Sequence, residues 1–262
     1  MASLLEKVDS KVRRAFSKAA GDYDLLTSLH KEIARELVEK IKLENPQEIL
    51  DVGMGTGYLT NKLTCLFPGA KVTGLDFAQG MIEEAQKNSE GFAVVEADAC
   101  QLPFKEETFD CVTSNLAYQW IEDLPQAFRE VSRVLKRQGL FCFTLFGHDT
   151  LKELFVSLNN IYGEKQIQPR RLASQDQVKE ALSKAGFKDV KVSIEHIQVH
   201  FASVTELLKW LKAIGANCLA EEIPVGKDWL IRLEEEYSKS YSDSFGIAST
   251  FEVIWAQVKK DH

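Results

Sequence analysis

Proline and cysteine are scarce in this sequence, and basic residues do not outnumber acidic ones. The 262 residues include 6 prolines and no Pro- or Gly-rich tract, so no long linker divides the chain. The 5 cysteines show no CxxC pair, which is typical of buried, reduced thiols. The net charge of −7 argues against nucleic-acid or membrane partners, and no apolar run is long enough to cross a bilayer. We expect one monomeric, cytoplasmic domain over 1–262.

Helical periodicity marks the N-terminal part of the chain. Leu29, Ile33 and Leu37 recur at intervals of four, the spacing of one apolar helix face. Pro46, preceded by asparagine, stops this helical pattern. The pattern predicts that 1–45 is helical, and we expect it to form a lid.

From Glu48 onward, short apolar runs alternate with amphipathic segments. The runs lack polar alternation, as in parallel strands that helices cover on both faces. This order predicts an α/β fold with a doubly wound, Rossmann-like sheet, and 46–150 as its cofactor-binding half. The expected strands are Glu48–Val52, Lys71–Asp76, Phe92–Asp98, Phe109–Asn115 and Leu140–Phe146, and the expected helices are Thr56–Phe67, Ala78–Asn88 and Leu124–Leu135.

After residue 150 the alternation is less regular. Two expected strands, Val190–Phe201 and Phe251–Val258, are suited to pair as a terminal hairpin. The stretch between them, 203–250, is predicted to be a helical insertion over the substrate side of the sheet. The expected helices in this part are Leu151–Ile161, Gln175–Ala185, Val204–Ile214 and Trp229–Tyr241.

A glycine-rich turn, Asp51-Val52-Gly53-Met54-Gly55-Thr56-Gly57, follows the first expected strand. Glycines tolerate positive φ and let a ligand approach the main chain. The turn leads into a helix N-terminus, whose free N–H groups suit a polar or anionic group. Asp76 closes the next strand, where a carboxylate can accept hydrogen bonds from a ribose diol. The turn therefore predicts a nucleotide-like ligand.

Two cofactors compete for this turn. A dinucleotide site has the pattern G-x-G-x-x-G, which requires glycine where Tyr58 stands. A pyrophosphate would also be repelled by the carboxylate of Asp51. S-adenosylmethionine carries an α-ammonium group and a ribose diol but no phosphate, so it suits both Asp51 and Asp76. The residues favour S-adenosylmethionine.

At these positions the sequence resembles the class I methyltransferases, whose first motif reads D-x-G-x-G-x-G. Asp51–Gly57 fits every fixed position, Asp76 fits the ribose-binding acid, and Ala97-Asp98-Ala99 fits the acidic segment beside the adenine. The resemblance implies a class I methyltransferase fold with S-adenosylmethionine as cofactor. The cofactor-binding residues that it implies are Asp51, Gly53, Gly55, Gly57, Asp76, Phe77, Asp98, Ala99 and Asn115.

Further segments extend the resemblance over nearly the whole chain. They are Phe16–Ala20 with Tyr23-Asp24, Ser114–Trp120, Asp149–Leu154, Leu211–Asn217 and Thr250–Val253. In these segments the chain resembles the malonyl-[acyl-carrier-protein] O-methyltransferases, which start pimelate-chain assembly for biotin. Family members usually have Leu at Tyr118 and Pro-Gly-Gly at Arg137-Gln138-Gly139. The resemblance implies methylation of the free carboxylate of malonyl-acyl carrier protein or malonyl-CoA.

The acceptor side of such a reaction needs orientation more than acid–base chemistry. A malonyl carboxylate is ionised at neutral pH, because carboxyl groups titrate near pH ~4. Arg170 and Arg171 are candidates to hold it in a bidentate pair, or else they are solvated loop residues. The resemblance implies that Tyr23 lies near the reacting methyl, and the alternative is core packing. Gln119 and Trp120 follow the fourth strand and either line the acceptor channel or pack on the sheet.

No metal site is expected. His196 and His200 lie four positions apart on an expected strand, which separates them by about 13 Å. An acidic acyl carrier protein needs a positive landing area, although charged helix faces are usually just solvated. The basic residues that can supply this area are Lys7, Lys11, Arg13, Arg14, Lys18, Lys209 and Lys212.

Two other functions stay open at the level of the sequence. The first is another class I methyltransferase that acts on a small carboxylate, a quinone or a phenol. The second is a non-catalytic S-adenosylmethionine-binding protein that partners another enzyme. Acceptor screening separates the first from the leading interpretation, and cofactor binding without turnover would favour the second.

Overall fold

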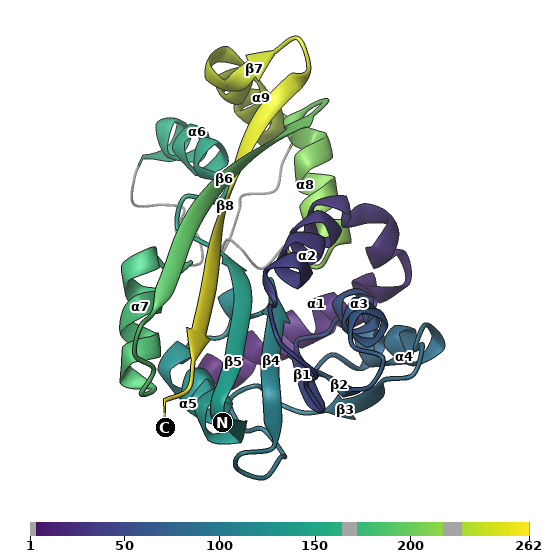
Figure 1. The fold of residues 1–262 in the computed structure, drawn as a ribbon. Helices are drawn as coiled ribbons and strands as arrows, with labels where there is room; N and C mark the ends of the chain where they lie inside the picture. Colours follow the sequence, from purple (N-terminus) through teal and green to yellow (C-terminus); the bar gives the residue numbers. More distant parts are fainter. Residues whose placement is uncertain (1–3, 164–171, 217–226, 262) are drawn as a thin grey trace.

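A computed structural model describes residues 4–163, 172–216 and 227–261 and is built around one mixed sheet (Figure 1). Its strand order is β3-β2-β1-β4-β5-β8-β6, with β8 antiparallel to both of its neighbours. The first five strands in this order pair in parallel, which confirms the predicted doubly wound α/β sheet. The strands are β1 (Glu48–Val52), β2 (Lys71–Asp76), β3 (Ala93–Glu96), β4 (Phe109–Asn115), β5 (Leu135–Phe146), β6 (Lys191–Phe201), β7 (Ser242–Asp243) and β8 (Gly246–Lys259).

Helices bury apolar side chains on both faces of the sheet, because successive strand residues point to opposite sides. On one face, Ile49 and Cys111 join the core formed with α2 (Ser28–Lys40), α3 (Tyr58–Leu66) and α4 (Gln79–Lys87). On the other face, Leu50 and Val112 pack with α5 (Leu124–Val134) and α7 (Gln175–Lys184). The central strands are therefore buried on both sides, as their continuous apolar runs predict.

The start of β5 differs from the expectation. A helix to Leu135 and a strand from Leu140 were expected, but α5 ends at Val134 and β5 begins at Leu135. Leu135 pairs with Phe109, and a register shift follows before the regular ladder resumes. Gln138 has a φ of 62°, and its N–H donates to the carbonyl oxygen of Lys260 at 2.9 Å. Arg137-Gln138-Gly139, which was expected to lie between a helix and a strand, is thus part of an irregular strand.

The expected terminal hairpin is present and longer than predicted, because β8 begins at Gly246 instead of Phe251. It pairs with β6 along its length, from Phe201 opposite Ile247 to Lys191 opposite Gln257. Helices lie around the end of the hairpin at which β6 ends and β8 begins (Figure 1). These are α6 (Lys152–Tyr162), α8 (Val204–Ala213) and α9 (Lys227–Tyr241).

The N-terminal helix α1 (Leu4–Leu26) contacts both α4 and the segment after α8. On one side, the N–H of Gly80 donates to the hydroxyl of Ser17, and a side chain at Gly80 would overlap the Ser17 backbone. On the other side, Gly215 after α8 lies against the backbone of Ala15. The second helix, α2, ends at Lys40, earlier than its periodicity predicted. Within the described residues, no helix combines the length and apolar character that a membrane span requires.

Candidate active site

A large cleft opens at the carboxyl ends of β1, β2 and β4, where ligands bind in open α/β sheets. It encloses about 1290 Å³ of empty space, including its open mouth, enough for a nucleoside-sized ligand. Helix α1 contributes Phe16 and Tyr23 to its wall. The predicted residues that line it are Tyr23, Gly53, Gly55, Asp76, Phe77, Asp98, Ala99, Asn115 and Trp120.

The glycine turn at the edge of this cleft requires glycine for both backbone and space. Gly53 has a φ of 71°, and a Cβ there would overlap that of Ala117. The N–H groups of Gly53 and Met54 both donate to the carbonyl oxygen of Leu75, at 2.7 and 2.9 Å. Gly57, at φ 89°, begins α3 beside the ring of Phe92 and does not line the cleft.

Asp76 is oriented by backbone amides. Its Oδ2 accepts from the N–H of Gly55 at 2.9 Å, and its Oδ1 accepts from the N–H of Ala78 at 2.8 Å. Burial raises the pKa of Asp76 above its ordinary value, and the hydrogen bonds from Ala78, Gly55 and Phe77 oppose this shift. The carboxylate is therefore held in one orientation at the cleft wall.

Asp51 lies deeper, in a pocket of about 440 Å³ that adjoins the cleft through Gly53, Gly55 and Asn115. It accepts hydrogen bonds from the hydroxyls of Thr60 at 2.7 Å and Thr113 at 3.3 Å. Burial raises the pKa of Asp51 to about 7; the two hydroxyls oppose the shift, and the charge of Asp76 adds to it. A positive group placed here would stabilise the ionised carboxylate.

The N-terminal helices are tied to the glycine turn. The carboxylate of Asp24 accepts from the hydroxyl of Thr56 at 2.8 Å and pairs with Lys31 at 3.5 Å. Arg13 pairs with Glu96 at the end of β3. Next to Asp24, Tyr23 lines both the cleft and the Asp51 pocket. Burial, with the charges of Asp76 and Asp24, raises the pKa of Tyr23, so it is a neutral phenol at pH 7.

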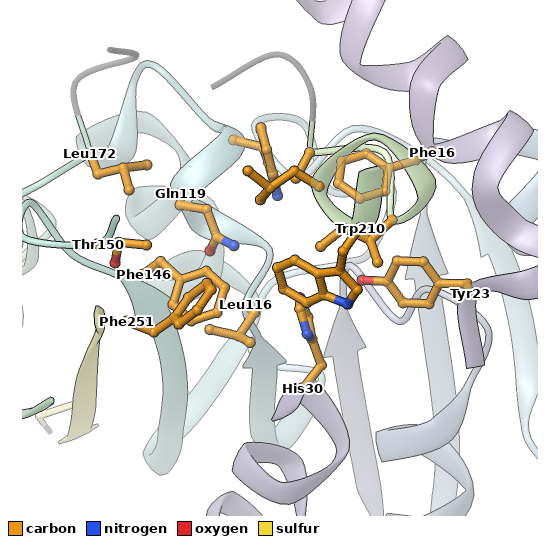
Figure 2. Close-up of a pocket in the computed structure, with 14 residues that line it drawn as sticks. Phe16, Tyr23, His30, Leu116, Gln119, Phe146, Thr150, Leu172, Trp210 and Phe251 are labelled. Carbon is orange, nitrogen blue, oxygen red and sulfur yellow. The ribbon is translucent and has the colours of Figure 1, made fainter. Parts of the chain in front are cut away.

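A separate apolar pocket of about 440 Å³, here called the acceptor pocket, shares Phe16, Tyr23, Leu116 and Trp120 with the cleft (Figure 2). Aromatic rings form much of its wall, with His30 between Tyr23 and Phe146 at centroid distances of 6.0 and 5.6 Å. Its described lining residues include no Lys, Arg, Asp or Glu. They are Phe16, Tyr23, His30, Leu116, Gln119, Trp120, Phe146, Thr150, Leu172, Trp210, Leu211, Ile214, Ala216 and Phe251.

Two polar atoms of the acceptor pocket, His30 Nδ1 and Gln119 Oε1, are buried without a hydrogen-bond partner among the described residues. Burial lowers the pKa of His30 to about 4, so its imidazole is neutral at pH 7. Other polar groups are already paired: the indole N–H of Trp210 donates to the carbonyl oxygen of Leu26 at 2.8 Å, and the hydroxyl of Thr150 bonds the Glu252 backbone. His30 Nδ1 and Gln119 Oε1 are thus available, within the described part of the pocket, to bond a ligand.

The structure brings together most of the predicted site residues. Gln119 and Trp120 line the acceptor pocket, and Trp120 also lines the cleft. The side-chain amide of Asn115 donates to the carbonyl oxygen of His30 at 3.1 Å. This hydrogen bond joins the wall of the cleft to the wall of the acceptor pocket. Arg170 and Arg171 lie outside the described residues, although the next residue, Leu172, lines the acceptor pocket.

His30 is the residue that the sequence analysis missed. It stands one position beyond Leu29 on the apolar face of α2, and nothing in its local pattern separates it from a core histidine. Its significance depends on Phe146 and Trp210, which are distant in the sequence.

Comparison with known proteins also indicates a methyltransferase. A family model described as a methyltransferase domain matches residues 50–143. A malonyl-[acyl-carrier protein] O-methyltransferase from Geobacter sulfurreducens is 35% identical, over 95% of this chain and 98% of that relative. One from Hahella chejuensis is 37% identical, over 93% of this chain and 88% of the relative. The likeness therefore extends well beyond the cofactor motif.

Solved structures share the fold at low sequence identity. The YcgJ protein of Bacillus subtilis superposes with a TM-score of 0.63 at 19% identity, covering 88% of this chain and 99% of that one. Phosphoethanolamine N-methyltransferase 2 of Haemonchus contortus, solved with S-adenosyl-L-methionine, gives a TM-score of 0.55 at 21% identity. It covers 90% of this chain and 53% of its own. These likenesses support the predicted class I methyltransferase fold.

Proposed function

The chain belongs to the malonyl-[acyl-carrier protein] O-methyltransferase family, and from that premise we propose that it methylates the free carboxylate of a malonyl thioester, with malonyl-acyl carrier protein as the acceptor. S-adenosylmethionine is the methyl donor. The resulting methyl ester primes pimeloyl-chain synthesis for biotin. The observation that carries the proposal is the acceptor pocket, which is apolar and shares Phe16, Tyr23, Leu116 and Trp120 with the cleft.

The two connected cavities suit the two ends of the cofactor. Adenosine would occupy the cleft, with its ribose diol at Asp76 and its adenine beside Asp98 and Ala99. The α-ammonium group would extend toward Asp51, whose buried carboxylate has no Lys or Arg partner among the described residues. Bound in this way, the cofactor would direct its methyl group toward Tyr23 and the acceptor pocket.

The acceptor pocket suits a reaction that consumes opposite charges. A malonyl carboxylate attacks the methyl carbon, the carbon–sulfur bond breaks, and both the sulfonium and the carboxylate lose their charge. No general base is needed, because carboxyl groups are ionised well below neutral pH. A pocket that excludes water solvates the separated charges poorly before the reaction and orients the two groups.

Selective capture of the acceptor needs polar groups in this apolar surrounding. We assign the carboxylate to Arg171, with Arg170 as its alternative, because Leu172 lines the pocket. His30 is placed to donate from Nδ1, in the tautomer that carries its proton there, to the carbonyl oxygen of the thioester, and Gln119 Oε1 is placed to accept from an N–H group of the arm that carries the thioester. Tyr23 would act as a neutral phenol that orients the methyl group and the carboxylate.

The carrier protein would dock beside α1 and α8. Lys11 and Lys18 on α1 and Lys209 and Lys212 on α8 are exposed, and the two helices contact each other. An acidic carrier would be attracted to this area even though the chain as a whole is negative. We also propose that α1 and α8 act as the lid over the acceptor, and that the enzyme is a cytoplasmic monomer. Size-exclusion chromatography with light scattering tests the monomer.

Mass spectrometry of the acceptor tests the function. Malonyl-acyl carrier protein incubated with the enzyme and S-adenosylmethionine is expected to gain one methyl group, and acetyl-acyl carrier protein to gain none. Malonyl-CoA in a parallel reaction measures the contribution of the carrier. Methylation of a simple carboxylate, quinone or phenol instead would move the enzyme to another acceptor class. Tight cofactor binding without turnover on any thioester would indicate a non-catalytic partner protein.

A further inference from the structure

A cluster of metal-ligand side chains lies at one end of the β5–β8–β6 ladder, behind the acceptor pocket. It consists of Asp149 in the turn after β5, His196 on β6 and Glu252 on β8. One ligand atom from each lies within 4.8 Å of the other two. We propose that these three side chains bind a divalent zinc ion.

Backbone pairing fixes the three ligands relative to one another. His196 and Glu252 are directly opposite in the antiparallel β6–β8 register, so their side chains emerge on the same face. The turn after β5 is tied to β8, because the N–H of Gly147 donates to the carbonyl oxygen of Glu252 at 2.8 Å. The N–H of Asp149 donates to Glu252 Oε2 at 3.3 Å. The arrangement therefore does not depend on flexible side chains alone.

The distances suit a small divalent ion. His196 Nε2 lies 3.6 Å from Glu252 Oε2 and 3.8 Å from Asp149 Oδ2. Nitrogen and oxygen ligands about 2.1 Å from a tetrahedral zinc ion are about 3.4 Å apart, so a small inward movement completes the site. One imidazole and two carboxylates form a donor set that zinc accepts. The side chains of His196 and Asp149 are 47% and 44% exposed, which leaves a path for the ion and for a water ligand.

Charge also favours a cation here. The side chain of Glu252 is 6% exposed, and among the described residues it pairs with His196 and with no lysine or arginine. On its other side, the carboxylate of Asp149 is bonded by the imidazole of His148. That bond joins His148 Nδ1 and Asp149 Oδ1 at 3.0 Å and leaves Oδ2 directed at the cluster. Such a contact behind a ligand is typical of metal sites.

The cluster lies where a bound ion would stabilise one wall of the acceptor pocket. Thr150 directly follows Asp149, and Phe251 directly precedes Glu252. Both Thr150 and Phe251 line the acceptor pocket. An ion that joins the β5 turn to β6 and β8 would hold this wall of the pocket in place. The proposal is independent of the acceptor assigned above, because Asp149, His196 and Glu252 line neither the cleft nor the acceptor pocket.

Zinc binding by the full chain tests the proposal, with His196→Ala compared against His200→Ala. His200 lies on the same strand and pairs with Asp243 at 2.9 Å, so its variant controls for loss of a partly exposed histidine. After treatment with a chelator, competition with a chromogenic zinc indicator measures affinity, and cobalt substitution reports ligand geometry. We expect one equivalent bound by the wild type and His200→Ala, and at least tenfold weaker binding by His196→Ala. Asp149→Asn should weaken binding similarly.

Circular dichroism in the chelator establishes that each variant folds. We expect zinc to raise the melting temperature of the wild type and of His200→Ala and to leave that of His196→Ala unchanged. Equal zinc affinity in the wild type and in folded His196→Ala would overturn the proposal, because it would show that any binding occurs elsewhere, for example at Cys65. Absence of zinc binding by the wild type at micromolar concentrations would also overturn it.

Discussion

The cofactor cleft and the acceptor pocket share walls but are built in opposite ways. In the cleft region, the carboxylates of Asp76 and Asp51 are already hydrogen-bonded by backbone amides or by threonine hydroxyls. In the acceptor pocket, His30 and Gln119 each keep a buried polar atom without a partner among the described residues. One region is preorganised by its own loops, and the other keeps two polar atoms, on His30 and Gln119, that no described residue bonds.

This contrast follows from where the residues lie in the chain. The cleft is formed by strand ends and the turns directly after them, so a short motif determines most of its geometry. The acceptor pocket combines α1, α2, α8 and the turn after β5, which are distant in the sequence and meet only through tertiary contacts. We therefore expect cofactor binding to depend on the local part and choice of the acceptor to depend on the assembled part.

The largest expected effect is on the cleft. Asp76→Ala removes a charged acceptor and should weaken S-adenosylmethionine binding by roughly 1.5–3 kcal/mol, about 10- to 150-fold in Kd. The matched control is Asp110→Ala, since Asp110 also accepts two backbone N–H groups, from Gln47 and Glu48, but at the opposite end of the sheet. Calorimetry measures both. An unchanged Kd in Asp76→Ala would remove its assigned role, and Asp76→Asn substitutes if the alanine variant does not fold.

The effect expected to be next in size is that of replacing Arg171, the arginine to which we assign the acceptor carboxylate. Arg171→Ala should lower kcat/KM for malonyl-acyl carrier protein by about tenfold or more, because a charge-assisted pair to the carboxylate is lost. Binding of S-adenosylmethionine should stay within twofold. Arg170→Ala is the comparison, and a larger loss there would exchange the two roles. Normal turnover in both variants would contradict capture of the carboxylate by this pair.

The affinity for S-adenosylmethionine should depend on pH through Asp51, which lies in the pocket that adjoins the cleft. In the free protein Asp51 has a pKa of about 7, and a bound ammonium group would lower it. Binding then releases a proton below pH 7, and the affinity for S-adenosylmethionine falls as the pH falls, by about tenfold from pH 8 to pH 6. Calorimetry in buffers of different ionisation enthalpy detects the proton. The dependence should disappear in Asp51→Asn, and its persistence there would exclude Asp51 as the source.

Replacing Gln119 should have a smaller effect, which raises the stability of the protein and lowers its activity. Its Oε1 lacks a partner among the described residues, so Gln119→Leu should stabilise the free protein, by about 1 kcal/mol. The same change should lower kcat/KM for the malonyl thioester several-fold and leave cofactor affinity unchanged. Thermal melting and steady-state kinetics together test this. A variant that is both less stable and fully active would show that Gln119 only packs.

The smallest expected effect is that of salt on the carrier. Activity on malonyl-acyl carrier protein should fall by a few-fold as ionic strength rises from about 0.05 to 0.3 M, because docking on Lys11, Lys18, Lys209 and Lys212 is screened. Activity on malonyl-CoA is measured in the same buffers. It shows how salt affects the shared cofactor and an acceptor that has charged phosphates but no carrier protein. Equal salt dependence for the two acceptors would contradict docking on this surface.

The sequence predicts the cleft far better than the acceptor pocket. Asp51–Gly57 and Asp76 combine strand pattern, turn chemistry and ligand chemistry at fixed spacing, so their positions follow from local rules. His30, Trp210 and Phe251 meet only because α2, α8 and β8 converge, and no local pattern encodes that. The early start of β5 was missed because its first residues are polar and irregular.

The most direct test of the central claim follows the transferred methyl group. The enzyme is incubated with malonyl-acyl carrier protein and S-adenosylmethionine carrying an isotope-labelled methyl group, and the product is examined by NMR. We expect a labelled methyl ester on the distal malonyl carboxylate, formed once per acceptor and absent with acetyl-acyl carrier protein. Label on carbon, nitrogen or sulfur, or equal labelling of the acetyl carrier, would contradict a methyltransferase that selects a free carboxylate.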